Sequence, residues 1–409
     1  MNKLKIINDP IYGLISIPNE LVFDLIEHPY FQRLSRIKQL GFDHLVFPNA
    51  VHSRLSHAIG ATHLMQQAID TLRRKGIEIS DHEAQSATAA VLLHDIGHGA
   101  FSHALEHTIV SNINHESISK ILMQKLNQQL DQRLQTAIEI FNDQYPKRFL
   151  YQLISSQLDV DRLDYLNRDS FFTGVSEGIV GWDRIIKVMN VVDNQLVFEE
   201  KGLYSIEKFL MARRMMYWQV YFHKTNMAAE NLLVNTLKRA NYLAKKGEKP
   251  FATPPLHYFL SNTVDEPTLK NEDQIAINWF TQLDDYDVLA SIKTWANDPN
   301  DAILQNLSKA LVNRTLPSLV LQKKPFETDY LNDVKQQIKT NLQLHSDHEL
   351  QYFYQIGTVQ HNTYSPDNEP IMILTKQKKL IELNQLSDFF STNLLTQTEQ
   401  KHYLYKPKF

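Results

Sequence analysis

Apolar residues recur three and four positions apart through most of the chain, which is the spacing of amphipathic helices. Helix start and stop signals fall at the ends of these stretches. Ser53 precedes one such pattern and Gly76 ends it, while Ser80 precedes an alanine-rich pattern that breaks at Gly97. The predicted helices cover residues 53–72, 80–93, 101–127, 131–143, 147–169 and 205–245, with shorter ones after Pro18 and from Pro29.

Short β patterns accompany these helices. Residues 4–18 hold two β runs around a turn, and residues 188–200 alternate around an Asp-Asn turn in the manner of a hairpin. From residue 317 the pattern changes to β-like runs around one helix near 327–344. We therefore expect a mainly α fold with small β-hairpins. It divides into a core at residues 1–245, a helical extension at 246–316 and a smaller α+β C-terminal module at 317–409.

The composition is that of an ordinary globular protein and excludes several classes. Of 409 residues, 43% are hydrophobic and 22% charged, and the formal charge is −4. There is no run of 18 apolar residues and no signal-peptide pattern, so we expect a cytoplasmic protein without a membrane partner. The chain has no Cys, which excludes disulfides, thiolate zinc sites and cysteine nucleophiles.

Histidine is the unusual component of this composition. The chain has 17 His, and nine of them lie between positions 52 and 115. His94 and Asp95 are adjacent at the end of a predicted helix, where they can share an ion if it lies near the helix end. His57 on the preceding helix and Asp161 are their natural partners. Two imidazoles and two carboxylates suit Mn²⁺, Fe²⁺, Co²⁺, Ni²⁺ or Zn²⁺, with Mg²⁺ also open.

Longer motifs around these residues indicate a family. The strings HDIGHGAFSH, HSRLSH and DVDRLDYLNRD together resemble the HD-domain phosphohydrolases. Within that superfamily they are similar to the dNTP triphosphohydrolases, the group that includes the SAM-and-HD-domain dNTPase. FQRLSRIKQLGFDHLVFPNA, NDPIYG and YFHK strengthen the resemblance, which covers roughly residues 5–235 and makes the core an HD catalytic domain.

The resemblance implies metal-dependent hydrolysis of dNTPs at the α-phosphorus, giving deoxynucleoside and triphosphate. It makes His57, His94, Asp95 and Asp161 the metal ligands. Asp159 is then expected to support a helix start, and Asp164 to pair with Arg168 four residues on. The implied catalytic groups are His98 at the α-phosphate and His103 with His115 as acid/base group, with Glu106 holding the tautomer of His103.

The same resemblance assigns the substrate contacts. Phosphate contacts are implied for Arg54, Arg162 and Arg213. Sugar contacts are implied for Gln39, Tyr165, Asp169 and Tyr221. We assign no role to His52, His63 or His107, for which ordinary structural positions are favoured.

Other functions stay open at this point. The alternative enzymes keep the metal and change the substrate to (p)ppGpp, a cyclic (di)nucleotide or GTP. The HD pair lacks the following Glu-Asp that the first would need, and no Gly-Tyr-Pro motif supports a cyclic-dinucleotide enzyme. We expect a nucleotide substrate and a homo-oligomer, either dimer or tetramer. The basic residues after 317 leave single-stranded nucleic acid open as a second partner.

Overall fold

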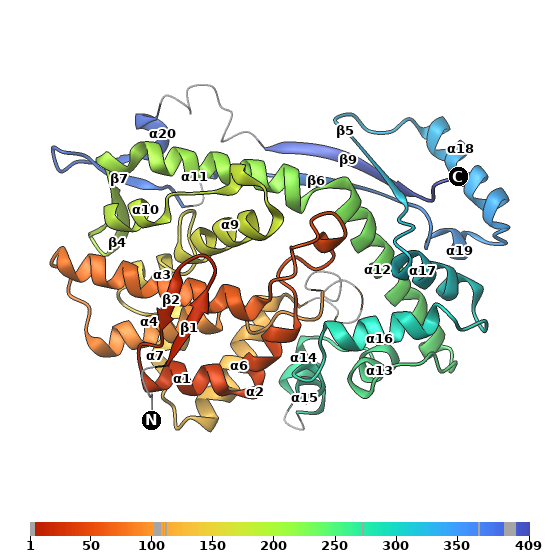
Figure 1. Ribbon diagram of the computed structural model, residues 1–409, viewed down its shortest axis with the longest axis horizontal. Helices are drawn as coiled ribbons and strands as arrows, with labels where there is room; N and C mark the ends of the chain where they lie inside the picture. The colour runs from red at the N-terminus through yellow and green to blue at the C-terminus, as the bar shows by residue number, and fades with distance from the viewer. Residues whose placement is uncertain are drawn as a thin grey trace.

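The computed structural model describes residues 5–101, 108, 110, 113–271, 274–366, 369–387 and 398–409. Most of this described chain is helical, and its strands form three small sheets (Figure 1). This confirms the prediction of a mainly α fold with small β elements. Within these ranges, no helix combines the length and the apolar character that crossing a lipid bilayer would need.

The elements of residues 5–188 form the helical mass around the predicted metal ligands. A hairpin leads into them, as the pattern at residues 4–18 predicts. In chain order they are β1 (Ile6–Asp9), β2 (Gly13–Ser16), α1 (Glu20–Glu27), α2 (Pro29–Gln32), α3 (Arg54–Arg74), α4 (Asp81–Leu93), α6 (His115–Gln129), α7 (Gln135–Phe141), α8 (Arg148–Gln152), α9 (Val160–Thr173) and α10 (Trp182–Val188).

Residues 189–312 continue with a hairpin and more helices. The hairpin confirms the Asp-Asn turn signal at residues 188–200. The elements are β3 (Met189–Val192), β4 (Gln195–Glu199), α11 (Leu203–Met216), α12 (Lys224–Lys245), α13 (Pro254–Ser261), α14 (Glu266–Lys270), α15 (Ile275–Phe280), α16 (Asp285–Trp295) and α17 (Ala302–Val312).

The remaining residues combine strands with short helices, in agreement with the change of pattern at residue 317. They are β5 (Ser318–Gln322), α18 (Thr328–Leu342), α19 (Asp347–Leu350), β6 (Gln355–His361), β7 (Met372–Leu374), β8 (Leu380–Glu382), α20 (Leu383–Leu386) and β9 (Glu399–Lys406).

The strands of the last hundred residues pack closely against the earlier helices. β7 pairs with β4 in parallel, so that β3, β4, β7 and β8 form one sheet. β9 lies between β5 and β6 in another, and both β6 and β9 run beside the α11–α12 junction (Figure 1). Arg214 of α11 pairs with Glu399 of β9 at 2.6 Å. One hydrophobic core extends from Ile15 to Tyr405, and the three-part domain division stays a prediction.

Three of the predicted long helices differ from the structure. In the stretch predicted for 101–127, Val110 forms a β-bridge with Val264 and α6 begins at His115, and the two other helices are interrupted. The helix predicted for 205–245 divides at a π-helical turn (Tyr217–Tyr221), and the side chain of His223 then caps α12 by accepting from the Thr225 amide (3.3 Å). The helix predicted for 147–169 divides into α8 and α9 because Asp159 accepts from the amides of Ser156 (2.8 Å) and Arg162 (2.7 Å). Apolar spacing runs across both breaks, so periodicity alone does not mark them.

Close approach of α3 and α9 depends on Gly60. A Cβ atom there would lie 2.0 Å from Asp164 Oδ1 and 2.2 Å from an Arg168 nitrogen, far inside contact distance. With hydrogen in that place, the two helices pack directly against each other. The packing sets the face of α3 that carries His57 against the face of α9 that carries Asp161.

Glu83 is expected to stabilise the start of α4 in a pH-dependent way. It forms a capping box with Ser80 and also bonds Lys147 (2.9 Å) and Tyr145 (3.0 Å). Burial alone would raise the pKa of Glu83, but these bonds outweigh it and lower the pKa to about 2 from 4.5. The stabilisation is therefore complete above pH 4.5 and disappears as the pH falls toward 2.

Glu83→Gln should accordingly lower the melting temperature by about 1–3 °C at pH 7, because charge-assisted bonds are lost. The difference from the wild type should shrink steadily below pH 4.5 in scanning fluorimetry. Glu78→Gln, at an exposed position shortly before α4, is the matched control and should melt like the wild type. A difference that is constant from pH 7 to pH 3 would contradict the assignment.

Candidate active site

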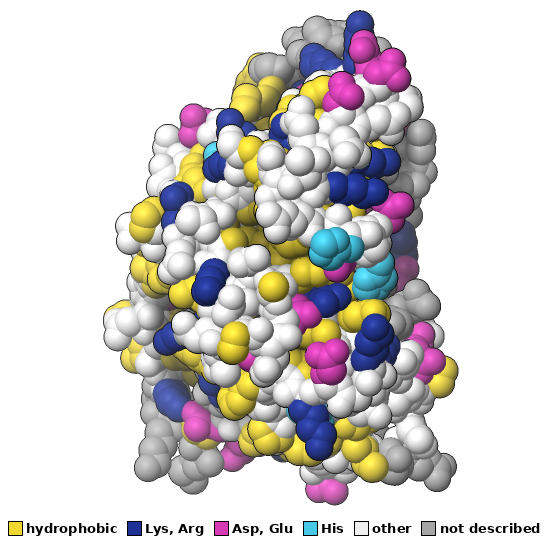
Figure 2. All heavy atoms as spheres, turned by 90° about the vertical axis from the view of Figure 1, so that its right-hand side faces the viewer, with side chains coloured by type: hydrophobic (Ala, Val, Ile, Leu, Met, Phe, Trp, Pro, Cys, Tyr) yellow, Lys and Arg dark blue, Asp and Glu magenta, His cyan; other side chains and the backbone are white. Residues whose placement is uncertain are grey.

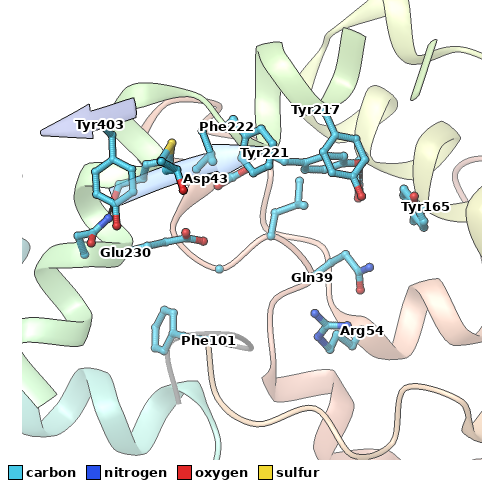
Figure 3. Close-up of a pocket in the computed structure, with 17 residues that line it drawn as sticks. Gln39, Asp43, Arg54, Phe101, Tyr165, Tyr217, Tyr221, Phe222, Glu230 and Tyr403 are labelled. Atoms are coloured by element: carbon cyan, nitrogen blue, oxygen red, sulfur yellow. Dashed lines mark hydrogen bonds between the residues drawn. The ribbon is translucent and has the colours of Figure 1, made fainter. Parts of the chain in front are cut away.

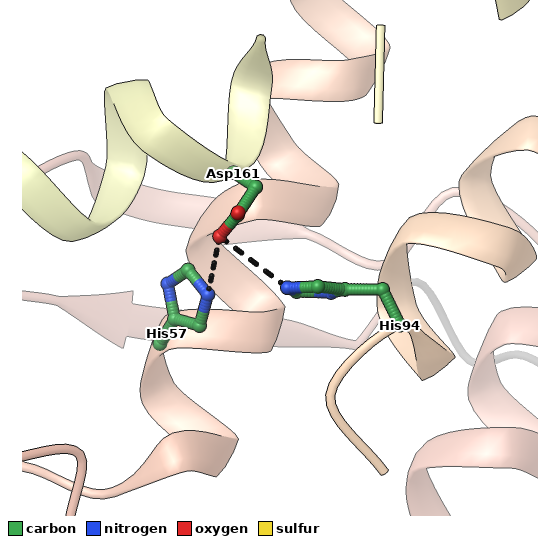
Figure 4. A group of neighbouring side chains, drawn as sticks. All are labelled: His57, His94 and Asp161. Atoms are coloured by element: carbon green, nitrogen blue, oxygen red, sulfur yellow. Dashed lines mark ion pairs between the residues drawn. The ribbon is translucent and has the colours of Figure 1, made fainter. Parts of the chain in front are cut away.

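Three helices bring a group of possible metal ligands together. His57 lies in the first turns of α3, His94 directly after α4 and Asp161 in the first turn of α9. Asp161 Oδ1 is 3.1 Å from His57 Nε2 and 3.3 Å from His94 Nε2 (Figure 4). Two atoms that bind one ion at 2.0–2.2 Å and at right angles lie about 3 Å apart. These separations therefore fit a shared divalent cation.

Hydrogen bonds to the Nδ1 atoms of His57 and His94 orient both imidazoles toward Asp161. His57 Nδ1 pairs with Asp164 Oδ2 at 2.8 Å, and His94 Nδ1 bonds the Val91 carbonyl at 2.6 Å. Each ring therefore presents Nε2 to Asp161 (Figure 4). Carboxylate or carbonyl partners of this kind hold metal-binding histidines in one tautomer.

Asp164 in turn belongs to a buried ionic network. Arg168 donates to both of its oxygens at 2.9 Å and also to Asp9 Oδ2 at 2.8 Å. The predicted Asp164–Arg168 pair is thus present, four residues apart on α9. The prediction missed the bond from Asp164 to His57, because sequence spacing does not show contacts between helices. Asp159 caps α9, as predicted.

Chemistry at the ligand group favours a cation. His57 Nε2 and His94 Nε2 are buried, and both face the same oxygen of Asp161, at 3.1 and 3.3 Å. Burial disfavours a charged imidazole, but the bonds to Asp161 and Asp164 outweigh it and raise the pKa of His57 to about 10. Burial likewise opposes the charge on His94, and Asp95 and Asp161 raise its pKa to about 9. The carboxylates therefore favour positive charge at this place. A bound divalent metal would supply that charge instead of protons on His57 and His94.

Asp95 connects this group to a second one. Its Oδ1 lies 3.3 Å from His94 Nε2 and 3.3 Å from His98 Nε2, and its Oδ2 accepts from Arg54 at 2.6 Å. Asp95, His98 and His115 also form a group whose ligand atoms lie within 4.8 Å of one another. Asp95 can therefore bind a metal ion together with His94 and also orient Arg54 and His98.

His98 and His115 lie face to face beside Asp95. Their rings stack with centroids 3.8 Å apart. Burial and then the nearby Arg54 charge hold the pKa of His98 well below its usual range. The His98 imidazole is therefore neutral and can donate a hydrogen bond without carrying charge. His103 and Glu106, predicted as further acid/base residues, lie outside the described residues.

A cavity of about 470 Å³ opens beside Arg54, which bonds the candidate metal ligand Asp95 (Figure 3). Five predicted substrate residues line it, and they come from segments between residues 39 and 221. This volume falls within the range of small-molecule sites. The five are Gln39, Arg54, Tyr165, Asp169 and Tyr221.

Asp169 is held by two side chains. Tyr221 donates from its hydroxyl to Oδ2 at 2.8 Å, and His52 Nε2 lies 2.8 Å from Oδ1. The His52 ring also stacks on Phe172, with centroids 4.5 Å apart. His52 was given no role, yet it positions a residue of the cavity wall. No sequence signal connects it to Asp169, which lies 117 residues away.

Two other predicted phosphate contacts lie outside the described lining of the cavity. Arg162 pairs with Asp159 at the start of α9. Arg213 Nη1 donates to the Thr363 carbonyl at 3.3 Å, and its guanidinium lies 6.0 Å from the Tyr217 ring centroid. Phosphate contacts by either residue remain predictions.

Several residues of the cavity wall were not predicted. They lie in the segment after Gln39, at Phe101 in the loop after His94, in and directly after the π-helical turn (Tyr217–Tyr221), on α12, and on strands β6 and β9. The C-terminal strands thus reach a site whose other walls belong to the core. The main additions are Asp43, Phe101, Tyr217, Phe222, Glu230, Asn231, Thr358, Val359 and Tyr403.

Two stretches of the chain match known protein-family models. Residues 54–169 match the family model of the HD domain, and residues 180–250 match that of the HD associated region. The first match begins at Arg54 and ends at Asp169. It therefore includes His57, His94 and Asp161.

Individual relatives extend the similarity over the whole chain. The Bacillus subtilis protein YwfO is 33% identical over 100% of this chain and 93% of its own. Deoxynucleoside triphosphate triphosphohydrolase SAMHD1 of Homo sapiens is 27% identical over 59% of this chain, and its Dictyostelium discoideum homologue is 31% identical over 59%. The chain spans about half of each of these two relatives, 45% and 50%.

A solved structure resembles the chain over nearly its full length. The crystal structure of a phosphohydrolase from Bacteroides thetaiotaomicron superimposes with a TM-score of 0.94 at 46% sequence identity. The match covers 99% of this chain and 100% of that one. The C-terminal strands that complete the cavity are thus part of a fold that both chains share.

Proposed function

The chain belongs to the HD-domain phosphohydrolases, and from this premise we propose that it hydrolyses deoxynucleoside triphosphates at the α-phosphorus, releasing deoxynucleoside and triphosphate. The two SAMHD1 relatives are named as deoxynucleoside triphosphate triphosphohydrolases. One observation carries the proposal for this chain. Arg54 lines the cavity and also donates to Asp95, so the substrate space and the metal group share a residue.

The proposal assigns the metal to His57, His94, Asp95 and Asp161, whose charge and convergence fit a divalent ion. Such an ion, when bound, supplies Lewis-acid polarisation of the phosphoryl group that is attacked. Its identity among Mn, Mg, Fe, Co, Ni and Zn is left to metal analysis. The remaining chemistry belongs to side chains around it.

Arg54 and His98 act on the phosphates in this proposal. The guanidinium of Arg54 neutralises phosphate charge, and the neutral imidazole of His98 donates a hydrogen bond to the α-phosphate. His115, stacked on His98, belongs to the proton-transfer group together with His103 and Glu106. Arg162 and Arg213 are proposed to bind the outer phosphates from positions just beyond the described cavity wall.

The sugar is proposed to lie against Gln39, Tyr165, Asp169 and Tyr221. His52 and Tyr221 each occupy one oxygen of Asp169, and a carboxylate oxygen can accept more than one bond. Asp169 can therefore accept from the 3′-hydroxyl while its orientation stays fixed. We further propose a cytoplasmic homo-oligomer, in keeping with the sequence-based expectation.

The products of the reaction test this assignment. The protein is incubated with each dNTP and NTP in Mg²⁺ or Mn²⁺, and products are separated by anion-exchange chromatography. Inorganic triphosphate with free deoxynucleoside is the expected result. Pyrophosphate or orthophosphate would show that another bond breaks, and hydrolysis of (p)ppGpp or a cyclic dinucleotide alone would assign the site to that substrate.

Arg54→Ala is expected to lower kcat/KM for dNTPs by about a hundredfold, because a preorganised cation is lost from the phosphate end. Steady-state assays measure the loss directly. Arg74→Ala, an exposed position near the end of the same helix, is the matched control and should retain normal activity. Equal rates for Arg54→Ala and the control would remove Arg54 from the mechanism.

A further inference from the structure

Asp285 is the first residue of α16 and lies outside both stretches that match the family models. It is only 2% exposed, so its carboxylate depends on partners within the protein. Oδ1 accepts from the Phe101 amide at 2.8 Å, and Oδ2 accepts from the Lys38 amide at 2.9 Å. One buried carboxylate thus joins two segments that are far apart in the sequence.

Each of these two segments carries part of the cavity wall. Phe101 lines the cavity itself, and Gln39, the residue after Lys38, lines it from another side (Figure 3). The Gln39 side-chain oxygen is buried and has no hydrogen-bond partner among the described residues, so a ligand in the cavity can supply one. The positions of both side chains depend on the backbone that Asp285 holds.

The Lys38 segment also sets the start of α3. Residues 37–39 pair with residues 52–54 in an antiparallel manner. The Gln39 amide donates to the His52 carbonyl at 2.9 Å, and the Arg54 amide donates back to this segment at 2.9 Å. His52 and Arg54 each hold a carboxylate of the site. The backbone that Asp285 holds is therefore continuous with that of other site residues.

Phe101 needs a partner for its amide because its backbone is strained. Its φ angle is +51°, in the left-handed region that bulky residues rarely adopt. Two contacts hold it there, the bond to Asp285 and the stacking of its ring on Phe42, with centroids 4.5 Å apart. Without the bond, the backbone would relax toward ordinary angles and the ring would move with it.

Arg33 connects the start of α16 to the metal group. It is fully buried and donates to the Leu283 carbonyl, just before α16, at 3.3 Å. It also donates to the Ile96 carbonyl, next to Asp95, at 2.8 Å. Asp285 therefore belongs to backbone that is fixed relative to the candidate metal ligands.

The charge of Asp285 strengthens its two bonds. Burial raises the pKa of Asp285 to about 6, although the bonds from Lys38 and Phe101 lower it. The carboxylate is thus ionised at neutral pH, and an ionised acceptor forms stronger hydrogen bonds than a neutral one.

We propose that Asp285 is a positioning residue of the active site, which fixes Gln39 and Phe101 relative to each other so that the substrate is held in its reactive geometry. The inference rests on the proposed function, in which Gln39 contacts the sugar. Asp285 acts on the reaction through these two neighbours. A misplacement of about 1 Å in a substrate-holding group can lower a rate by about a hundredfold.

Asp285→Asn tests the role directly, because it keeps the shape of the side chain and removes one acceptor. The amide accepts from one backbone N–H, and its own N–H group faces the other. We expect kcat/KM for dNTPs to fall by about 10- to 100-fold. Metal content by mass spectrometry should stay at the wild-type level, because no ligand is changed.

Asp285→Glu separates the acceptors from the size of the side chain. It keeps the charge and both oxygens on a longer stem, so it should retain more activity than Asp285→Asn. Lower activity in Asp285→Glu than in Asp285→Asn would show that side-chain size decides the effect, and it would overturn the proposal.

Asp284→Asn is the matched control at the neighbouring position. It removes the same charge, and asparagine caps a helix about as well as aspartate does. In the structure Asp284 caps α16 and pairs with Arg36, whose side chain is half exposed. The control should keep kcat/KM within about twofold of the wild type, because a half-exposed ion pair contributes little. An equal loss in both variants would assign the effect to the helix start in general and overturn the proposal.

A double-mutant cycle with Gln39→Ala distinguishes positioning from a general loss of stability. If Asp285 acts through Gln39, adding Asp285→Asn to Gln39→Ala should lower kcat/KM by about threefold or less, because the side chain that it positions is already absent. A merely structural role would give the same factor in both backgrounds. Equal factors would therefore overturn the proposal.

Hydrogen exchange tests the bridge without any substrate. In Asp285→Asn, the amide of Lys38 or of Phe101 should exchange at least about tenfold faster than in the wild type and in Asp284→Asn, as measured by mass spectrometry of peptides. Faster exchange supports the positioning of the cavity walls even if no dNTP is hydrolysed and the proposed function fails. Unchanged exchange at both amides, with dNTP hydrolysis intact, would overturn the inference and leave the proposed function standing.

Discussion

Asp161→Asn is expected to reduce dNTP turnover by about a thousandfold and to leave the purified protein without its divalent metal. The carboxylate contacts both His57 Nε2 and His94 Nε2, and it is the ligand that α9 supplies to this group. An amide keeps the shape but loses the negative charge that balances a cation. A bound metal stabilises the transition state by several kcal/mol, and losing that stabilisation corresponds to a rate about a thousandfold lower.

Metal content by mass spectrometry and kcat by product chromatography should fall together in this variant. Asp183→Asn, at an exposed position of α10, is the matched control and should keep both. Melting temperature in metal-free buffer checks that Asp161→Asn still folds. Full metal content with lost activity would move Asp161 from metal binding to another step, and full activity would remove it from the site.

The sequence singles out the candidate metal ligands because they lie inside short motifs, and their role as ligands stays a prediction. His94 and Asp95 lie together at a helix end, and the motif around His57 and Asp161 identifies the other two positions. The structure places Asp161 Oδ1 3.1 Å from His57 Nε2 and 3.3 Å from His94 Nε2. Local signals thus predict that these side chains, which lie near helix ends, come close together.

Residues that line the cavity but lie far apart in the sequence cannot be predicted in this way. His52 contacts Asp169 across 117 residues, and Glu230 lies on a helix whose start depends on an unpredicted π-helical turn. Tyr403 comes from a module outside the motif resemblance and reaches the cavity only because β9 pairs with β6 beside α12. Such contacts follow from packing, and neither periodicity nor motif spacing specifies them.

Helix boundaries show the same limit at a smaller scale. The pattern predicts one helix over 205–245, whereas the chain forms a π-helical turn and a fresh N-cap at His223. That break places Tyr221 where its hydroxyl bonds Asp169. Apolar spacing reports which face is buried, and it continues unchanged through a turn that is itself packed in the core.

Asp164→Ala is expected to destabilise the protein by about 3–5 kcal/mol, because it leaves Arg168 buried with half of its partners. Arg168 is fully buried, and its bonds go to Asp164 and Asp9. For a chain of this length the loss corresponds to a melting temperature about 4–6 °C lower. Metal affinity should also fall, by about 10- to 100-fold, because His57 Nδ1 loses the carboxylate that orients it.

The double variant Asp164→Leu/Arg168→Met separates these two effects. Replacing both charges with apolar side chains removes the unpaired guanidinium, although Asp9 loses its bond from Arg168 and keeps those from the Ile11 and Tyr12 amides, so the melting temperature should recover part of the loss. Metal affinity should stay low, because His57 still lacks its partner. Thermal melting of the metal-free protein and metal competition titrations measure the two quantities independently. If metal affinity returned together with stability, Asp164 would act on the fold alone, and the orientation of His57 would have to come from the packing of α3 against α9.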